Sequence, residues 1–454
     1  GTLLLGGLKC GSGRHRGTHG SDATHRSMIE VFLILVLAIV GGTLLLGWFC
    51  WWLMVPSQSS WMAARRRGQK ARCLVVLGSG GHTAEMLRDL ASLGKHLQCL
   101  HFKYLIADTD RSSQEKAEAF EVQRGYESAH VVRVPRAREV GQSYSSSVFT
   151  TLRAAWFSLL AVLTDPPDLI IANGPGTCVP VVFAACLVRA LRFWEVKVVY
   201  SESFACVDHL SFSGRLLYHV AEHFTVQWPQ LMALYPKAKY AGQLYAAEQV
   251  ERARQGRTPL PPADLDPLPS VQSVVGTPTA VVTVGSTKFD SLIHAIDCAE
   301  FLSFLHGLGI KKLKVQRGAG QYLPVNLGSP GQPALAGLEV EVFQYSAELP
   351  AELCQAALVV SHAGAGTILD CLSSGRRLVV VPNEGLMANH QVQLGMALQE
   401  QRLLFCFRTG ELLRSLKEAD FSTLRCFPKT TSPVFAALVC QLTGLQFPAE
   451  VAAQ

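Results

Sequence analysis

The sequence lacks the motifs that would place it in several large enzyme and binding classes. Its 13 cysteines include no C-x-x-C pair, which favours free thiols in a reducing compartment over disulfides or structural zinc. It has no Walker-type Gly-Lys-Ser/Thr sequence, so phosphoryl transfer by a P-loop is not indicated. No histidine, cysteine and acidic residues cluster at metal-ligand spacing, and we therefore expect neither a bound metal nor another cofactor.

Charge is also scarce. Only 17% of the 454 residues are charged and 49% are hydrophobic, with a mean hydropathy of +0.22. One membrane segment together with buried parallel strands would account for so apolar a chain. The net charge of +6 suits an anionic membrane surface or a phosphate ligand, and no signature of RNA or DNA binding is present, so we expect no nucleic-acid partner.

The N-terminal part of the chain predicts one membrane span. Residues 1–28 have no apolar periodicity and are expected to be disordered or foreign to the natural product. Residues 29–56 are predicted to form a transmembrane helix, because Val31–Val55 carries no charge and about 20 apolar residues suffice to cross a bilayer. Arg65, Arg66 and Arg67 follow and predict that the rest of the chain is cytosolic. A cleaved signal peptide is the alternative.

Beyond the apolar run, short apolar strands alternate with amphipathic helices. This pattern predicts parallel sheets with helical crossovers, hence an α/β protein. A proline-rich stretch interrupts the pattern and is expected to be a flexible linker. The predicted domains are residues 70–247 and 279–454, joined by a linker at residues 248–278.

Glycine-bearing turns follow several of the predicted strands. They are Gly78–Thr83, Asn173–Thr177, Gly285–Thr287 and Ser361–Thr367. The last opens on a helix expected from Thr367 to Ser374 and ended by Gly375. Unpaired amides and the helix dipole make such a helix start an anion site, and glycine lets a phosphate approach the backbone. We interpret Ser361–Thr367 as a diphosphate site.

His82 is the candidate general base, because a neutral imidazole at a helix start could accept a proton from a hydroxyl. The opposing interpretation is that it only bonds the backbone or a phosphate. Glu202 is the reserve base, while Glu139 and Asp108 are expected to be structural or to position substrate. Asp108 also stands about where a ribose-binding acid would, so an NAD(P) oxidoreductase is a weaker alternative, although Gly78–Gly81 lacks the G-x-G-x-x-G spacing.

Several motifs in order resemble the eukaryotic UDP-GlcNAc transferase that adds the second sugar in dolichol-linked oligosaccharide synthesis. The first half resembles its membrane-anchored subunit, through Gly78–Thr83, Ile106–Asp110, Asn173–Pro180 and Val226–Pro229. The second half resembles its catalytic, donor-binding subunit, through Val282–Asp290, Ser361–Thr367 and Asn383–Gln391. In many eukaryotes the halves are separate proteins, and here the proline-rich segment joins them.

The resemblance implies a GT-B fold, in which two Rossmann-like domains face a cleft. It implies metal-independent, inverting transfer of GlcNAc from UDP-GlcNAc to GlcNAc-diphosphodolichol, on the cytosolic face of the endoplasmic reticulum membrane. Other early enzymes of the same pathway are conceivable partners. The class set against this one is a non-catalytic, membrane-anchored adaptor that uses the same two domains for assembly.

The expected site has three parts. The catalytic residues are His82 and Glu202. Donor contacts are expected from Gly285, Ser286, Thr287, Ser361, His362, Ala363, Gly364, Ala365, Gly366, Thr367, Glu384, Asn389, His390 and Gln391. Acceptor contacts are expected from Gly78, Ser79, Gly80, Gly81, Thr83, Arg136, Arg138, Asn173, Gly174 and Gly176.

Overall fold

The structure is a computed structural model, and it describes most of the chain after residue 69. The described residues are 41–44, 46–47, 70–137, 144–174, 176–191, 193–262, 265–269, 276–327, 337–384, 390–428 and 432–446. Their contacts divide the chain into one unit of residues 1–57 and another of residues 58–454.

The first unit bears on the membrane prediction. Residues 41–44 and 46–47 are helical. The remainder of the predicted span at 29–56, and all of the predicted extension at 1–28, lie outside the described residues. Among the residues that are described, no helix combines the length and hydrophobicity needed to cross a bilayer. The transmembrane helix therefore stays a prediction.

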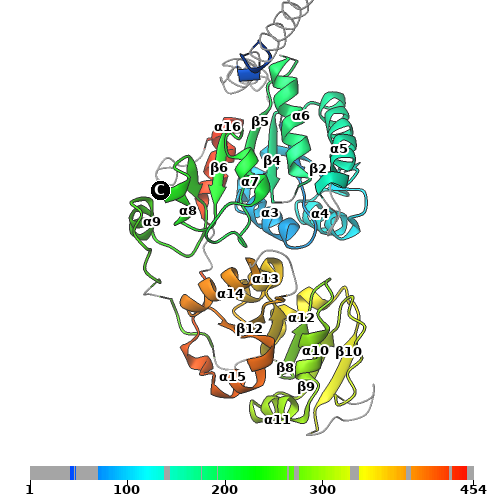
Figure 1. The fold of residues 1–454 in the computed structure, drawn as a ribbon, viewed down its shortest axis with the longest axis vertical. Coiled ribbons are helices and arrows are strands. Elements are labelled where there is room, and N and C mark those ends of the chain that lie inside the picture. The colour runs from blue at the N-terminus through cyan, green and yellow to red at the C-terminus, as the bar shows by residue number, and fades with distance from the viewer. Residues whose placement is uncertain are drawn as a thin grey trace, which may run out of the picture. The chain divides into compact units, whose positions relative to one another are not determined.

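The second unit contains two parallel sheets, each the centre of what we call a lobe (Figure 1). The first lobe has a seven-stranded sheet. Its strands are β1 (Ala71–Val76), β2 (Leu100–Ala107), β3 (Val131–Val134), β4 (Leu169–Asn173), β5 (Lys197–Ser201), β6 (His223–Val226) and β7 (Ala238–Tyr240). Its helices are α3 (Gly81–Ala91), α4 (Arg111–Gln123), α5 (Tyr144–Thr164), α6 (Cys178–Ala190), α7 (Phe212–Leu217), α8 (Leu231–Leu234) and α9 (Ala247–Arg254).

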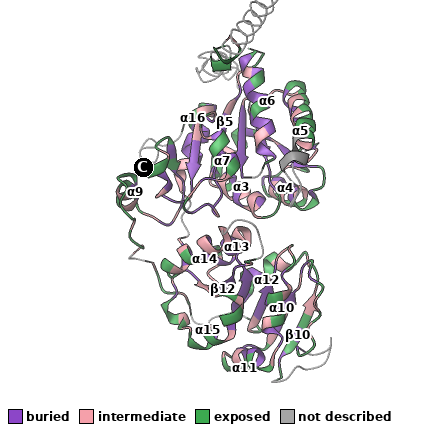
Figure 2. Cartoon of the chain, viewed as in Figure 1, coloured by how far each residue is buried: buried purple, intermediate pink, exposed green. Residues whose placement is uncertain are grey.

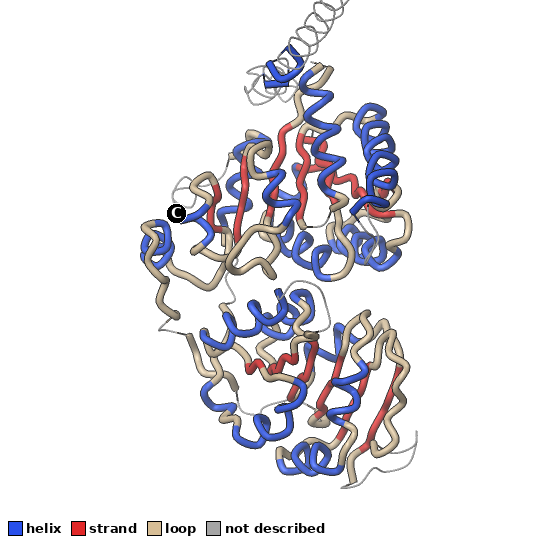
Figure 3. Tube along the Cα trace, in the orientation of Figure 1, coloured by secondary structure: helices blue, strands red, loops and turns tan. Residues whose placement is uncertain are grey.

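The second lobe has a six-stranded sheet. Its strands are β8 (Thr279–Thr283), β9 (Lys312–Gln316), β10 (Glu339–Phe343), β11 (Leu358–His362), β12 (Arg377–Val381) and β13 (Phe405–Cys406). Its helices are α10 (Asp290–Ile296), α11 (Ala299–Gly307), α12 (Leu349–Gln355), α13 (Ala365–Ser373), α14 (His390–Glu400) and α15 (Leu412–Glu418). Figure 3 shows the strands of each sheet between helices.

The strand orders show where the progression of strands across each sheet reverses direction. The first sheet runs β3-β2-β1-β4-β5-β6-β7 and the second β10-β9-β8-β11-β12-β13, so the order reverses between β1 and β4 and between β8 and β11. Ligands of open α/β sheets bind beyond the carboxyl ends of the strands at such reversals. All four predicted glycine turns follow these four strands, and they therefore lie at the two ligand-binding positions of the fold.

Burial explains why the central strands are apolar almost throughout. Val75 of β1, Ile171 of β4 and Val360 of β11 are each no more than 1% exposed, because helices cover both faces of a parallel sheet (Figure 2). Burying a side chain of this size contributes about 1.5–3 kcal/mol. The eleven cysteines that the structure describes are all free thiols.

The C-terminal helix corrects the predicted limits of the second domain. Helix α16 (Pro433–Thr443) was expected within the donor domain of residues 279–454. Instead its apolar residues Phe435, Ala436, Val439 and Cys440 pack into the core of the first lobe, with β1, β2 and α3. The chain thus returns to the first lobe after completing the second, which periodicity in the sequence could not reveal.

The predicted linker at residues 248–278 is also more ordered than expected. Its start forms α9, where Val250 and Ala253 are buried. Farther along, Pro267 forms an antiparallel bridge with Arg425, and the Pro269 carbonyl accepts a hydrogen bond of 2.5 Å from Arg377. The proline-rich part is therefore attached to the second lobe at these points.

Candidate active site

The first glycine turn leads directly into α3. Strand β1 ends at Val76 and α3 begins at Gly81. Gly80, with φ of +70°, turns the chain, and no side chain caps the helix. By contrast, the Asp110 carboxylate caps α4 by accepting from the Ser113 amide. The first-turn amides of α3 are therefore available to an anion.

The second lobe repeats this arrangement. Strand β11 ends at His362, Gly364 is the N-cap, and α13 begins at Ala365, two residues before the predicted Thr367. No side chain caps α13 either. The helix ends at Ser373, and Gly375 follows with φ of +64°, as predicted for its terminator.

The two helix starts lie against each other. A Cβ added to Gly81 would stand 3.0 Å from the Gly366 nitrogen, and one added to Gly366 would stand 3.0 Å from the Gly81 Cα. Farther along the same helices, Arg88 Nη2 lies 3.4 Å from Asp370 Oδ1. Two positive dipole ends thus meet at one point, a geometry that favours a bound anion.

His82 is held by the second turn of the first lobe. Its Nδ1 lies 3.1 Å from Asn173 Oδ1, and its side chain is 32% exposed. Gly174, with φ of +76°, makes room for the ring, since a Cβ there would stand 2.3 Å from Nδ1. Asn173, predicted to contact the acceptor, is only 1% exposed, and it bonds His82 and Glu85. Glu85 was not identified from the sequence.

Glu202, the reserve base, is not placed for proton transfer to a ligand. Its side chain is buried, and its carboxylate accepts hydrogen bonds from the Ser203 amide at 2.9 Å and from Ser211 through both N and Oγ at 3.0 Å. Burial raises the pKa of this carboxyl group despite these bonds. The contacts tie the loop at residues 203–211 to the end of β5, so the structure gives Glu202 a structural role.

His362 is buried where His82 is half-exposed. It is 8% exposed, and burial lowers its pKa to about 4, so the ring is neutral at physiological pH. A Cβ at Gly285 would stand 2.4 Å from its Cε1, and one at Gly364 would stand 2.3 Å from its Nε2. The ring is therefore packed between the two glycine turns of the second lobe, and its Nδ1 has no hydrogen-bond partner among the residues that the structure describes.

The other predicted donor residues divide into exposed and structural ones. Ser361 is fully buried and its hydroxyl bonds the His362 carbonyl, while Thr287 Oγ1 bonds the Val284 carbonyl. Glu384 is exposed and lies 3.6 Å from Arg408, and the Gln391 side chain accepts from the Asn383 amide at 2.9 Å. Ser286 is exposed, Ala365, Gly366 and Thr367 are partly exposed, and Ala363 is buried.

His390 begins α14 and faces a residue of the first lobe. Its ring centroid lies 5.0 Å from that of His209, and burial lowers the pKa of His390. The sequence predicted His390 as a donor contact, and its contact with His209 was not foreseen. Asn389, the preceding predicted donor contact, lies outside the described residues.

The predicted acceptor residues are likewise mixed. Thr83 is fully buried, its hydroxyl bonds the Gly78 carbonyl and Ser113 Oγ, and it therefore braces the turn rather than facing a ligand. Ser79, Gly80 and Gly176 are exposed, while Arg136 is partly buried. Arg138 and Glu139 lie outside the described residues. Asp108, the alternative ribose-binding residue, is exposed beyond β2.

Comparisons with known proteins agree with this division into two lobes. Residues 73–244 match the family described as oligosaccharide biosynthesis protein Alg14 like, and residues 279–432 match the glycosyltransferase family 28 C-terminal domain. The chain is 46% identical over 178 residues to the UDP-N-acetylglucosamine transferase subunit ALG14 of Homo sapiens, covering 38% of this chain and 82% of that protein. It is 40% identical over 176 residues to the subunit of that name from Candida albicans, covering 38% and 78%.

A solved structure supports the fold alone. The putative UDP-N-acetylglucosamine 2-epimerase from Listeria monocytogenes superposes with a TM-score of 0.53 at 11% identity, over 84% of this chain and 98% of that one. The family matches confirm the predicted fusion of a transferase-subunit half to a glycosyltransferase half, and they disfavour the oxidoreductase alternative. The chain belongs to the Alg14-like family, carries a glycosyltransferase family 28 C-terminal domain behind it, and is a glycosyltransferase with two parallel sheets in a GT-B fold.

Proposed function

We propose that this chain transfers GlcNAc from UDP-GlcNAc to GlcNAc-diphosphodolichol, giving chitobiosyl-diphosphodolichol. The observation that carries the proposal is the joining, in one chain, of an Alg14-like half and a family 28 glycosyltransferase half. The relatives of the first half are named as subunits of a UDP-N-acetylglucosamine transferase. A single chain that supplies both halves is then sufficient for the reaction.

The donor would bind to the second lobe. The uncapped start of α13 offers its first-turn amides, at Ala365 to Thr367, to the diphosphate of UDP-GlcNAc. As the bond from the sugar to UDP breaks, negative charge grows on the leaving phosphate. Fixed dipoles that point at such charge contribute roughly 3–4 kcal/mol for each donor group that is removed in other enzymes. Glu384, Asn389 and Gln391 would orient the ribose or the donor sugar.

The acceptor would bind to the first lobe, with the lipid diphosphate at the start of α3. His82 Nε2 would accept the proton of the acceptor 4-hydroxyl as that oxygen attacks C1 of the donor sugar. One bond forms from the oxygen to C1, the bond from C1 to the UDP oxygen breaks, and the configuration at C1 inverts. The contact of Nδ1 with Asn173 leaves Nε2 as the nitrogen for this step.

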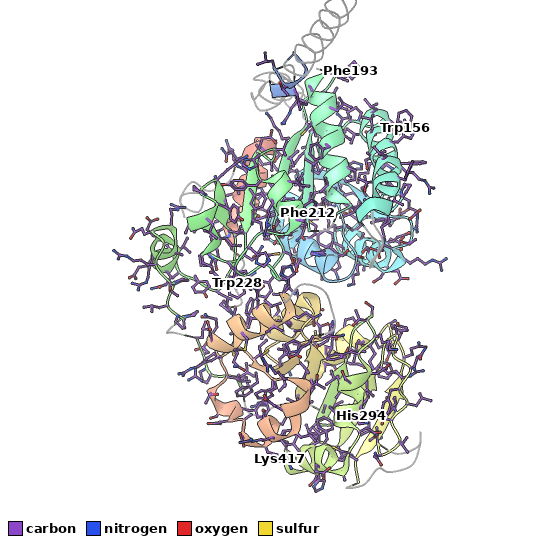
Figure 4. The ribbon with its side chains drawn as sticks, in the orientation of Figure 1. Trp156, Phe193, Phe212, Trp228, His294 and Lys417 are labelled. Atoms are coloured by element: carbon purple, nitrogen blue, oxygen red, sulfur yellow. The ribbon has the colours of Figure 1, made fainter. Side chains whose placement is uncertain are left out.

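The lipid substrate places the reaction at a membrane, for which we propose the cytosolic face of the endoplasmic reticulum. Helix α5 carries large exposed apolar residues three or four positions apart, and α6 lies beside it with others. They are Phe149, Leu152, Trp156 and Leu160 on α5 and Phe183, Leu187, Leu191 and Phe193 on or just after α6. Figure 4 labels Trp156 and Phe193 at the outer surface of the first lobe. Such a surface suits contact with lipid.

The non-catalytic adaptor finds less support, because both helix starts are uncapped and they approach each other at two residues without a Cβ, Gly81 and Gly366. A surface used only for assembly has no need of these features. The family 28 match in the second lobe also belongs to an enzyme class.

The test is an assay of the purified full chain in detergent with radiolabelled UDP-GlcNAc and a synthetic GlcNAc-diphospholipid. The proposal predicts one new lipid product that carries two GlcNAc residues. UDP binding without any such product would support the adaptor instead. Transfer to the phospholipid only when it lacks the first GlcNAc would contradict the proposed step.

A further inference from the structure

Two buried polar side chains, Asn173 and Glu85, lie behind the candidate base His82 and form a hydrogen-bonded chain with it. His82 Nδ1 lies 3.1 Å from Asn173 Oδ1, and Asn173 Nδ2 donates to Glu85 Oε2 over 3.3 Å. Glu85 and His82 are three residues apart on the first turns of α3, which puts both on one face of the helix. Asn173 comes from the end of β4, so the chain joins two elements across the sheet reversal.

The identities of the three groups fix which ring nitrogen carries the proton. An ionised carboxylate can only accept hydrogen bonds, so the amide nitrogen of Asn173 must face Glu85. The amide oxygen must then face His82, and Nδ1 must carry the hydrogen that it accepts. In the neutral ring this leaves the lone pair on Nε2, as proton transfer from an acceptor requires.

Glu85 is itself held in place. It is 6% exposed, accepts from Ser203 Oγ at 3.1 Å through Oε1, and accepts from the Phe204 amide at 3.2 Å through Oε2. Its Oε2 also lies 4.0 Å from His82 Nδ1, close enough to stabilise an imidazolium. The position of the Glu85 carboxylate is therefore fixed by contacts within the protein and not by solvent.

We propose that Glu85 is a positioning residue for the transfer reaction, which acts through Asn173 to hold His82 in the tautomer and orientation of a general base. The inference rests on the proposed function for its catalytic meaning. It moves Asn173 from the predicted acceptor contacts to the support of His82. It also explains why position 174 is a glycine, because a side chain there would displace the His82 ring.

Other charged groups face this chain and define the background against which it is tested. Glu202, at the end of β5, interacts electrostatically with His82, and Asp89 on α3 and the Cys206 thiol interact with Glu85. Arg88, the next basic residue on α3, pairs with Asp370 of α13. None of these groups is altered in the variants below.

Two substitutions at Glu85 separate geometry from charge. Glutamine can accept from Asn173 and the Phe204 amide through its oxygen and donate to Ser203 Oγ through its nitrogen, so Glu85→Gln keeps the geometry and removes the charge. We expect kcat/KM within about tenfold of wild type. Leucine keeps neither the hydrogen bonds nor the charge. We therefore expect kcat/KM of Glu85→Leu to fall about a hundredfold or more, within the range that general bases contribute.

The matched control is Glu121, a 5% exposed carboxylate of the same lobe that bonds Tyr104 and Arg124 far from His82. Glu121→Leu should lower the amount of folded protein but leave kcat/KM per folded molecule near wild type. Circular dichroism and thermal unfolding report folding for each variant.

A readout without substrate separates this inference from the proposed function. Diethyl pyrocarbonate acylates neutral imidazole, so the rate of His82 modification, followed by peptide mass spectrometry, falls as pH decreases. Without the Glu85 carboxylate and its hydrogen bond to Asn173 the imidazolium is less stable, and the pH of half-maximal modification should fall by about half a unit or more in Glu85→Leu. The exposed His219 supplies the reference in each sample, and its profile should not move.

The outcomes are distinct. If folded Glu85→Leu keeps wild-type kcat/KM, or if the His82 profile in Glu85→Leu coincides with that of wild type, Glu85 does not position His82. If wild type transfers no GlcNAc while the modification profile still shifts as expected, the proposed function fails and the structural relation between Glu85 and His82 stands.

Discussion

The two lobes each carry a histidine beside a glycine turn at the reversal of a parallel sheet. The two histidines differ in the exposure of their side chains and in the residues that they contact. The His82 side chain is 32% exposed and is oriented by Asn173. His362 is 8% exposed and wedged between Gly285 and Gly364. His82 follows β1 in the first turn of α3, whereas His362 ends β11, the counterpart of β4. His82 is thus partly accessible to a ligand, whereas His362 fills the space between two backbone turns.

This difference matches the division of labour that we propose. The acceptor must lose a proton, so the first lobe needs a titratable group within reach of ligand. The donor must leave with its charge stabilised, so the second lobe needs backbone amides in fixed positions and no competing side chain. A neutral, buried imidazole sets the spacing of those turns without adding charge near the diphosphate.

The largest effect is expected from Gly366→Val in the second lobe. The added side chain would meet Gly81 and cover the amides at the start of α13, so UDP affinity should fall below detection by isothermal calorimetry. Gly410→Val is the matched control, because nothing lies within 4 Å of a Cβ at that position of the same lobe. Unchanged UDP affinity in Gly366→Val would remove α13 from donor binding.

His82→Ala tests the first lobe and should give the opposite pattern. Loss of the base should reduce kcat by about a thousandfold, within the range for general base catalysis, while UDP affinity stays at the wild-type value. Steady-state kinetics and calorimetry on the same preparation measure both. Turnover near wild type would end the assignment of His82 as the base.

Substitution of His362 should change the pH dependence of stability rather than turnover. Burial lowers its pKa to about 4 from a usual value near 6.5, so the unfolded chain binds more protons between these pH values. Its contribution to stability is therefore complete above about pH 6.5 and is lost as pH falls towards 4, by at most about 3 kcal/mol.

His362→Leu should flatten that decline in the free energy of urea unfolding, measured from pH 7 to pH 4.5. Part of the decline should remain, because burial lowers the pKa of His223 to about 4 as well. An equal slope in wild type and variant would show that His362 is protonated without cost in the folded state.

The smallest effect is expected at the ion pair between Arg88 and Asp370, whose side chains are 25% and 36% exposed. Partly solvated pairs contribute about 1 kcal/mol or less. Arg88→Gln should therefore lower UDP affinity and thermal stability only slightly, and added salt should reduce the difference from wild type. A loss comparable to that of Gly366→Val would mean that this pair, and not the glycine contact, holds α3 against α13.

Local signals predicted much of the fold. The alternation of short apolar strands with helices predicted parallel sheets, and the structure contains two of them. Helix α13 begins earlier than predicted, since glycine, here Gly364 and Gly366, disfavours a helix on its own. Contact between Gly81 and Gly366 supplies the reason for glycine at these two positions, and no local pattern encodes it.

Longer-range features were less accessible. The return of α16 to the first lobe depends on packing between residues more than three hundred positions apart. The candidate base His82 was identified from its turn, but its support by Glu85 was missed. An acid three residues after a histidine at a helix start was the available signal, although such spacing alone more often marks a surface ion pair.

A structure of the full chain with UDP bound would test the central claim most directly. The account predicts that oxygens of the UDP diphosphate lie about 2.7–3.2 Å from the backbone nitrogens at the start of α13, between residues 363 and 367. A diphosphate bound elsewhere, with those nitrogens contacting only solvent, would contradict it.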